Sequence, residues 1–126
     1  MTGERVLVVE DNEMNMKLFR DVLDASGYRT LEATTGSEAV AMASEHTPEL
    51  VLMDIQLPDV DGVQALHRLR ADPRTATIPI VALTAQAMQG DRERFLAAGF
   101  DGYMSKPVNV RDLIGIVREH CDRGSR

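Results

Sequence analysis

The feature that most constrains the fold is a repeated alternation of short apolar runs with longer segments of helical period. The runs at residues 6–9, 50–53 and 80–83 are apolar throughout, with no alternation of polar and apolar residues. Strands of this kind are covered on both faces, as in a parallel sheet. We therefore predict five strands, at residues 5–9, 29–33, 50–53, 80–83 and 102–105.

Signals for helix ends separate these strands. Residues 35–38, Thr-Gly-Ser-Glu, form a capping box, Asp61 is a predicted N-cap, and Gly27 and Gly99 are stop signals. Helical period then predicts an inward apolar face for each helix. The residues expected on one apolar face are Met14, Leu18, Phe19, Val22 and Leu23 in the first helix, Val63, Leu66 and Leu69 in the third, and Val110, Leu113, Ile114 and Val117 in the fifth. The fourth helix has Phe95 and Leu96 before Gly99.

Strand–helix alternation predicts right-handed crossovers and an α/β fold. The expected architecture is a doubly wound, five-stranded parallel sheet of order 2-1-3-4-5 with helices on both faces. A chain of 126 residues fits one domain, residues 1–126. We expect its core at about residues 5–121 and a frayed tail at residues 122–126.

Composition excludes several classes of function. The net charge of −6 argues against nucleic acid as a partner, because nucleic-acid binding rewards basic surfaces. No apolar stretch approaches the ~20 residues that cross a membrane. The lone cysteine, Cys121, cannot form an internal disulfide, which favours a cytoplasmic location. The three histidines lie far apart on helix-like segments, so we expect no histidine metal site.

Acidic residues follow the first and third strands, where this fold order reverses. Ligands bind at that edge, beyond the carboxyl ends of the strands. Glu10, Asp11 and Asp54 are therefore expected within ~4–6 Å of one another, where each pair repels by about 4 kcal/mol at an effective dielectric near 20. Mg²⁺ would relieve this repulsion. We predict Asp11 and Asp54 as direct ligands, Glu10 as a ligand through water, and the backbone carbonyl of Gln56 as a further ligand.

The predicted strand ends also supply groups that bind phosphate. A carboxylate beside Mg²⁺ can attack phosphorus and form an aspartyl phosphate. Lys106 offers a positive charge, and the Thr84 hydroxyl and Ala85 N–H are hydrogen-bond donors. Each residue alone has an ordinary structural explanation, such as a helix cap or a turn. Structural explanations do not predict that all of them meet at one edge of one sheet.

Together these residues resemble the response-regulator receiver domain of bacterial two-component signalling, over residues 6 to about 120. Residues 10–19 and 84–91 resemble single-domain regulators of the cell cycle, and receivers attached to hybrid kinases are similar there. The motifs that support the resemblance are Val8-Val9-Glu10-Asp11-Asn12, Met53-Asp54-Ile55-Gln56-Leu57-Pro58 with Asp61-Gly62, Leu83-Thr84-Ala85, and Lys106-Pro107.

The resemblance implies that Asp54 is the phosphoacceptor and that a histidine kinase supplies the phosphoryl group. The receiver would catalyse only its own phosphorylation and later hydrolysis, and would otherwise not be an enzyme. Gln56 and Gln86 would flank the phosphate and tune hydrolysis. Many members have two aspartates where this chain has Glu10 and Asp11.

The resemblance also implies a switch. Thr84 would move toward the phosphate, Tyr103 would be the switching aromatic residue, and the bond between Lys106 and Pro107 would be cis. The face formed by the fourth helix, fifth strand and fifth helix would then meet downstream targets. The first helix, around Asn15 and Leu18, would face the kinase.

Several alternatives stay open at this stage. The chain could be a stand-alone regulator, a carrier that passes phosphate to a histidine phosphotransfer protein, or a receiver fragment of a hybrid kinase. A phosphohydrolase acting through an aspartyl phosphate normally has a second acid where this chain has Gln56. A flavin-binding protein shares the fold order but has a hydroxyl-rich loop after the first strand, where this chain has acids.

Overall fold

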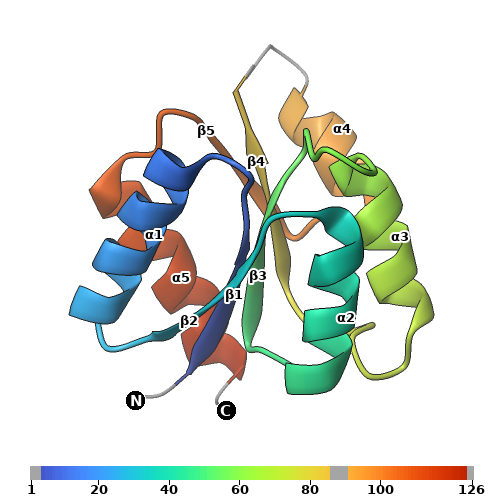
Figure 1. Ribbon diagram of the computed structural model, residues 1–126, viewed down its shortest axis with the longest axis horizontal. Helices are drawn as coiled ribbons and strands as arrows, with labels where there is room; N and C mark the ends of the chain where they lie inside the picture. Colours follow the sequence, from blue (N-terminus) through green and yellow to red (C-terminus); the bar gives the residue numbers. More distant parts are fainter. Residues whose placement is uncertain (1–3, 86–90, 125–126) are drawn as a thin grey trace.

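The strands and helices alternate along the chain, as shown in the computed structural model, which describes residues 4–85 and 91–124 (Figure 1). The strands are β1 (Arg5–Val9), β2 (Arg29–Ala33), β3 (Leu50–Asp54), β4 (Ile80–Thr84) and β5 (Gly102–Ser105). The helices are α1 (Glu13–Ala25), α2 (Gly36–His46), α3 (Gly62–Ala71), α4 (Asp91–Ala98) and α5 (Val110–Gly124).

The strands form one parallel sheet of order β2-β1-β3-β4-β5, which confirms the predicted fold class. Strands β3 and β4 each run one residue further than expected, because Asp54 pairs with Leu83 and Thr84 pairs with Ser105 in register. Both polar residues are therefore fixed by the sheet itself.

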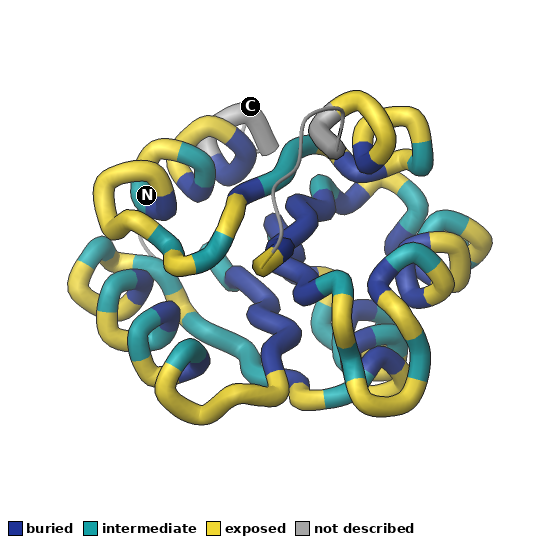
Figure 2. The backbone as a smooth tube through the Cα atoms, turned by 90° about the horizontal axis from the view of Figure 1, so that it is seen from above, coloured by how far each residue is buried: buried dark blue, intermediate teal, exposed yellow. Residues whose placement is uncertain are grey.

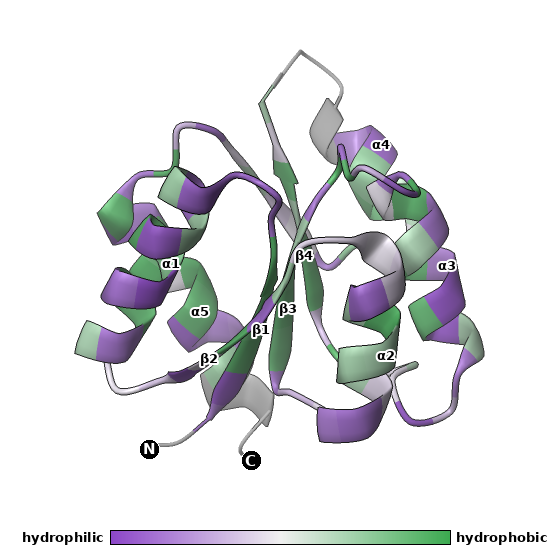
Figure 3. Cartoon of the chain, in the orientation of Figure 1, coloured by the Kyte–Doolittle hydropathy of each residue, from purple (hydrophilic) through white to green (hydrophobic). Residues whose placement is uncertain are grey.

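Two layers of helices cover the sheet. Alternate strand residues face opposite sides, as the period of two in a strand requires. Val8, Leu52 and Leu83 pack in the same cluster as residues of α1 and α5, whereas Val9, Met53 and Ala82 pack in the same cluster as residues of α2, α3 and α4. Seen from above, buried strands lie between rows of helices whose outer sides are exposed (Figure 2). The strands in the middle of the sheet are mostly hydrophobic, whereas the helices mix hydrophilic and hydrophobic residues (Figure 3).

Side-chain caps begin α1, α2, α3 and α5. The side chains of Asn12, Thr35, Asp61 and Asn109 accept hydrogen bonds from backbone N–H groups in the first turns of these helices. The capping box of α2 differs slightly from its usual form, because Glu38 accepts from the N–H of Thr34 instead of Thr35. Each cap fixes the point at which the chain leaves the site edge of the sheet.

The expected inward face of α1 was wrong in one position. Met14 is 82% exposed, and Met16 is buried instead with Phe19 and Leu23. The helix begins at Glu13 after its Asn12 cap, so the buried stripe follows residues 16, 19 and 23. Val110, which was expected on the apolar face of the fifth helix, is 46% exposed.

Fraying of residues 122–126 stays a prediction. Helix α5 continues to Gly124, and the buried Cys121 anchors its last turns against the sheet. No helix within the described part of the chain is long and apolar enough to cross a membrane.

Candidate functional site

The acids predicted to share a crevice do lie together. Val9 pairs with Met53 in the sheet, so Glu10 and Asp54 follow side by side at the carboxyl ends of β1 and β3. Glu10, Asp11 and Asp54 each place a carboxylate oxygen within 4.8 Å of the others. Glu10 is 1% and Asp54 is 5% exposed, whereas Asp11 is open to solvent. The cluster is therefore half enclosed, with one accessible side.

Lys106 neutralises part of this charge from the end of β5. Its Nζ lies 2.7 Å from Oε1 of Glu10 and 2.8 Å from Oδ2 of Asp54. Burial raises the pKa of the Glu10 carboxyl, the nearby charge of Asp54 raises it further, and Lys106 opposes both effects. Burial alone would lower the pKa of the Lys106 ammonium, but the two carboxylates outweigh it and raise the pKa. The single ammonium group of Lys106 therefore pairs with two carboxylates.

The Asp54 carboxylate is held in a fixed orientation. Its Oδ1 accepts a hydrogen bond from the N–H of Gln56 at 2.9 Å, and its Oδ2 accepts one from Lys106 at 2.8 Å. A carboxylate held at both oxygens loses little rotational freedom when it reacts. Asp54 is therefore preorganised toward the cavity that it lines.

A cavity of about 400 Å³ opens at this edge of the sheet. It is large enough for a metal ion, a phosphoryl group and several waters, since a water occupies about 30 Å³ in the liquid. Asn15 of α1 also lines it. The resemblance implied only that the helix around Asn15 faces the kinase, not that Asn15 belongs to the site. The lining residues are Glu10, Asp11, Asn12, Asn15, Asp54, Gln56, Leu57, Pro58, Ala85 and Lys106.

The donor set fits a hard divalent cation. Oxygen atoms of three carboxylates meet within 4.8 Å, and such ligands suit Mg²⁺. Oε1 of Glu10 is buried and ion-paired with Lys106 at 2.7 Å. Three carboxylates meet here and Lys106 is a single ammonium, so the cluster keeps net negative charge that a cation would neutralise. Direct binding by Asp11 and Asp54, with Glu10 acting through water, stays a prediction.

The remaining predicted residues lie around the same edge. Thr84 is buried at the end of β4, and the exposed Ala85 follows it into the cavity lining. The bond between Lys106 and Pro107 is cis. The Gln56 side chain is exposed at the cavity rim, and Gln86 lies outside the described residues.

Tyr103 lies within β5, before Lys106 in the chain, and is half buried. Its ring lies 6.1 Å from that of Phe95 of α4, with the planes tilted by 45°. Phe95 also meets Phe100 edge to face at 6.0 Å. This aromatic cluster joins β5 to α4, so a movement of the Tyr103 ring would change its packing against α4.

The loop between β3 and α3 closes tightly on Asp54. A Cβ atom on Gly62 would lie 2.8 Å from the carbonyl oxygen of Asp54 and 2.9 Å from Cα of Ile55. The N–H of Gly62 donates to the carbonyl of Ile55 at 2.8 Å. Only glycine permits this approach, and Gly62 therefore allows the loop to return directly over the end of β3.

The parallel sheet, with acids and a lysine clustered at one edge, defines a class of protein. The chain belongs to the response regulator receiver domain family, whose sequence profile matches residues 6–118. It is 48% identical to the polar-differentiation response regulator DivK of Brucella ovis over 115 residues, which is 91% of this chain and 94% of that protein.

Solved structures agree with this assignment. The receiver domain of a sensor histidine kinase from Pseudomonas aeruginosa, solved with a magnesium ion coordinated in its active-site cleft, is 37% identical to this chain. It has a TM-score of 0.88, covering 96% of this chain and 99% of that one. The chemotaxis response regulator CheY4 of Vibrio cholerae shares the fold, with a TM-score of 0.87 at 24% identity over 94% of this chain and 98% of its own.

Proposed function

We propose that this receiver accepts a phosphoryl group on Asp54, with Mg²⁺ bound beside it, and signals by binding other proteins according to its phosphorylation state. The observation that supports this proposal most strongly is the meeting of Glu10, Asp11, Asp54 and Lys106 at one edge of the sheet. We propose that residues 1–126 act as one receiver unit in the cytoplasm, where Cys121 would stay reduced.

The proposed reaction moves one phosphoryl group between two side chains. An oxygen of the Asp54 carboxylate attacks phosphorus in a kinase phosphohistidine, a P–O bond forms, and the P–N bond breaks. The imidazole leaves with the electron pair of that bond and takes up a proton. Hydrolysis later returns Asp54 and inorganic phosphate, since water attacks the aspartyl phosphate. Apart from these two steps on itself, the chain would have no catalytic turnover.

Charge neutralisation is the main task of the site. Lys106 would pair with phosphoryl oxygens, and the Thr84 hydroxyl and Ala85 N–H would donate hydrogen bonds to others. Asp11, Asp54 and the Gln56 carbonyl would hold Mg²⁺, with Glu10 acting through water. Bound there, Mg²⁺ would supply Lewis-acid charge that screens the incoming phosphoryl group. Gln56 and Gln86 would set how readily water reaches the phosphate.

The signal would leave through the face formed by α4, β5 and α5. A phosphoryl group adds roughly two negative charges. Lys106 is already paired with Asp54, so a phosphate on Asp54 would draw on the same ammonium at the end of β5. Thr84 would move toward the phosphate and Tyr103 would follow it, which would shift α4 through Phe95.

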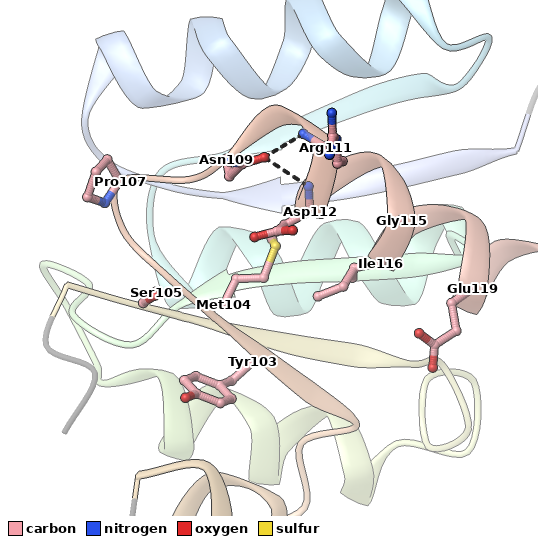
Figure 4. A pocket seen from close by; sticks show the side chains of 10 residues that line it. All are labelled: Tyr103, Met104, Ser105, Pro107, Asn109, Arg111, Asp112, Gly115, Ile116 and Glu119. Atoms are coloured by element: carbon pink, nitrogen blue, oxygen red, sulfur yellow. Dashed lines mark hydrogen bonds between the residues drawn. The ribbon is translucent and has the colours of Figure 1, made fainter. Parts of the chain in front are cut away.

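A cavity of about 550 Å³ lies on this face, between β5 and α5 (Figure 4). Tyr103 and Met104 line it from β5, and Ile116 and Glu119 line it from α5. Asn109 shapes its upper end, because its side chain accepts hydrogen bonds from the N–H groups of Arg111 and Asp112. We propose that downstream protein targets bind here, and that α1 faces the histidine kinase or phosphotransfer protein.

Cell-cycle or cell-division control is the proposed setting. Its support is the 48% identity to a polar-differentiation response regulator over nearly the whole of both chains. A phosphorelay carrier, or a receiver that belongs to a hybrid kinase, remains the second candidate, because a sensor-kinase receiver is 37% identical.

The test is phosphotransfer from purified histidine kinases to the wild-type chain and to Asp54→Asn. We expect label on the wild type and none on Asp54→Asn, and alkali or hydroxylamine should remove the label because both cleave an acyl phosphate. Asp24→Asn, which changes an exposed acid at the end of α1, is the matched control and should be labelled normally. Undiminished labelling of Asp54→Asn would refute the assignment.

A second assay separates signalling from hydrolysis of small substrates. A phosphohydrolase would turn over a generic phosphate ester many times, whereas a receiver would not. Sustained turnover that is lost in Asp54→Asn would favour the phosphohydrolase.

A further inference from the structure

The loop between β3 and α3, residues 55–61, is anchored to a helix that has no side chain in the cavity. Asp59 lies near its tip. Its Oδ1 accepts a hydrogen bond from the N–H of Gly36 at 2.8 Å, and its Oδ2 accepts one from the N–H of Ser37 at 3.0 Å. Both donors belong to the first turn of α2, where backbone N–H groups have no partner within the helix.

Asp59 is not a substitute for the helix's own cap. Thr35 already caps α2 by accepting from the N–H of Glu38 at 3.1 Å. Asp59 bonds to the N–H groups that Thr35 does not reach, from a loop that is 22 residues away in the sequence. These bonds hold the pKa of the Asp59 carboxyl well below its usual range, because they favour the ionised form.

Packing at the same point fixes the loop against α2. A Cβ atom on Gly36 would lie 2.3 Å from Cγ2 of Val60 and 3.6 Å from Cδ1 of Leu57. Val60 and Leu57 themselves pack on the hydrophobic core. The glycine at the start of α2 thus leaves room for the loop to sit directly on the helix.

The anchored loop contains the residue proposed to supply a metal ligand. Gln56 lines the cavity and donates its N–H to Asp54, and it forms an isolated bridge with Asp61. Gly62 ties the other end of the loop back to Ile55. The position of Gln56 therefore depends on a short, closed loop whose outer contact is Asp59.

We propose that Asp59 is a positioning residue, which holds this loop on the first turn of α2 so that Gln56 stays at the cavity rim in the place that strengthens Mg²⁺ binding. This inference rests on the proposed function, because it concerns the same metal. Asp59 is not among the residues that line the cavity.

The first test is calorimetric titration of MgCl₂ into the EDTA-treated, dialysed full chain. Asp59→Ala removes both hydrogen bonds, and Asp59→Asn keeps the shape but can accept with one oxygen only. We expect Asp59→Ala to raise the Kd for Mg²⁺ roughly tenfold, the range found for groups that orient metal ligands, and Asp59→Asn to raise it less. Thr35→Ala is the control, because it weakens the start of α2 without touching the loop.

Equal Kd values for Asp59→Ala and Thr35→Ala would overturn the inference, because Asp59 would then only stabilise the helix. An unchanged Kd in Asp59→Ala would overturn it as well, while leaving the proposed function intact. Failure of the wild-type chain to bind Mg²⁺ would instead overturn the proposed function and the inference together.

Amide hydrogen exchange on the metal-free chain gives a readout that is independent of the ion. Asp59→Ala should speed exchange at Gly36 and Ser37 and also at Gln56, across the loop. Thr35→Ala should speed exchange only at the start of α2. Faster exchange confined to α2 in Asp59→Ala would contradict a positioning role.

Discussion

At the scale of single residues, the site is a balance of charges. Glu10 and Asp54 are almost fully buried, and Lys106 bridges them. A buried carboxylate without a partner is costly, so the ammonium stabilises the metal-free fold, in addition to its proposed role toward phosphate. The sequence predicted that these residues meet, because each follows a strand. It did not predict that Glu10 turns toward Lys106, because that depends on which side-chain direction the packing leaves open.

Replacing Lys106 with methionine should therefore destabilise the metal-free chain. We expect a loss of roughly 2–3 kcal/mol in unfolding free energy in EDTA, somewhat below the cost of breaking a fully buried pair. The side chain of Lys106 is 16% exposed, which accounts for the reduction. Urea unfolding measures the change.

The matched control for that variant is Lys17→Met. Lys17 pairs with Asp21 at 2.6 Å on the surface of α1, and both side chains are mostly exposed. This loss should stay within about 0.5 kcal/mol. Equal losses for the two variants would contradict the account of the charge balance.

Asp11, in contrast to Lys106, is expected to lower the stability of the chain in the absence of metal. Asp11→Ala removes one of three acids that meet within 4.8 Å, so it should raise the unfolding free energy in EDTA by about 0.5 kcal/mol. The wild type should gain about 2.7 kcal/mol when Mg²⁺ reaches 100 times its Kd, and Asp11→Ala should lose most of that gain. Thermal unfolding with and without Mg²⁺ measures both effects.

Glu45→Ala serves as the control for Asp11→Ala, because Glu45 is an exposed acid of α2 that does not line the cavity. Its response to Mg²⁺ should match that of the wild type. A less stable Asp11→Ala in EDTA, or a wild type whose melting temperature ignores Mg²⁺, would count against a shared metal pocket.

At the scale of elements, strands were easier to predict than helix faces. The apolar runs of β1, β3 and β4 are buried on both sides, so their position required only the run itself. The face of α1 depends on where its cap lies, and taking Met14 as an inward residue placed the stripe wrongly. The role of Asp59 was not predictable, because its partners at residues 36 and 37 become neighbours only after folding.

The return of the loop onto β3 gives a prediction at this scale. Gly62→Ala would press a methyl group onto backbone atoms of Asp54 and Ile55, which cannot move aside as a side chain can. We expect a loss of roughly 1–3 kcal/mol in unfolding free energy and slower phosphorylation of Asp54. Urea unfolding and the rate of phosphotransfer measure the two effects.

Gly115→Ala provides the contrast. A Cβ atom there meets nothing within 4 Å, and the residue lies inside helix α5. This variant should gain roughly 0.5–1 kcal/mol, because alanine favours a helix more than glycine does. If Gly62→Ala kept wild-type stability, the loop would be looser than the close approach of Gly62 to Asp54 and Ile55 requires.

At the scale of the whole molecule, the strand order determines where the chemistry lies. Order β2-β1-β3-β4-β5 makes β1 and β3 neighbours, and thereby brings acids 43 residues apart in sequence into one cluster, as the switch-point rule predicts. The same order leaves β5 at the sheet edge beside α4 and α5, so Lys106 joins the site to an exposed face.

The measurement that tests the central claim most directly is chemical mapping of the phosphoryl group. The chain is phosphorylated with acetyl phosphate and Mg²⁺, reduced with borohydride, digested, and sequenced by mass spectrometry. Reduction converts an aspartyl phosphate to homoserine, so homoserine should appear at residue 54 only when both acetyl phosphate and Mg²⁺ are present. Homoserine at residue 11, or a stable phosphoryl group elsewhere with residue 54 intact, would contradict the account.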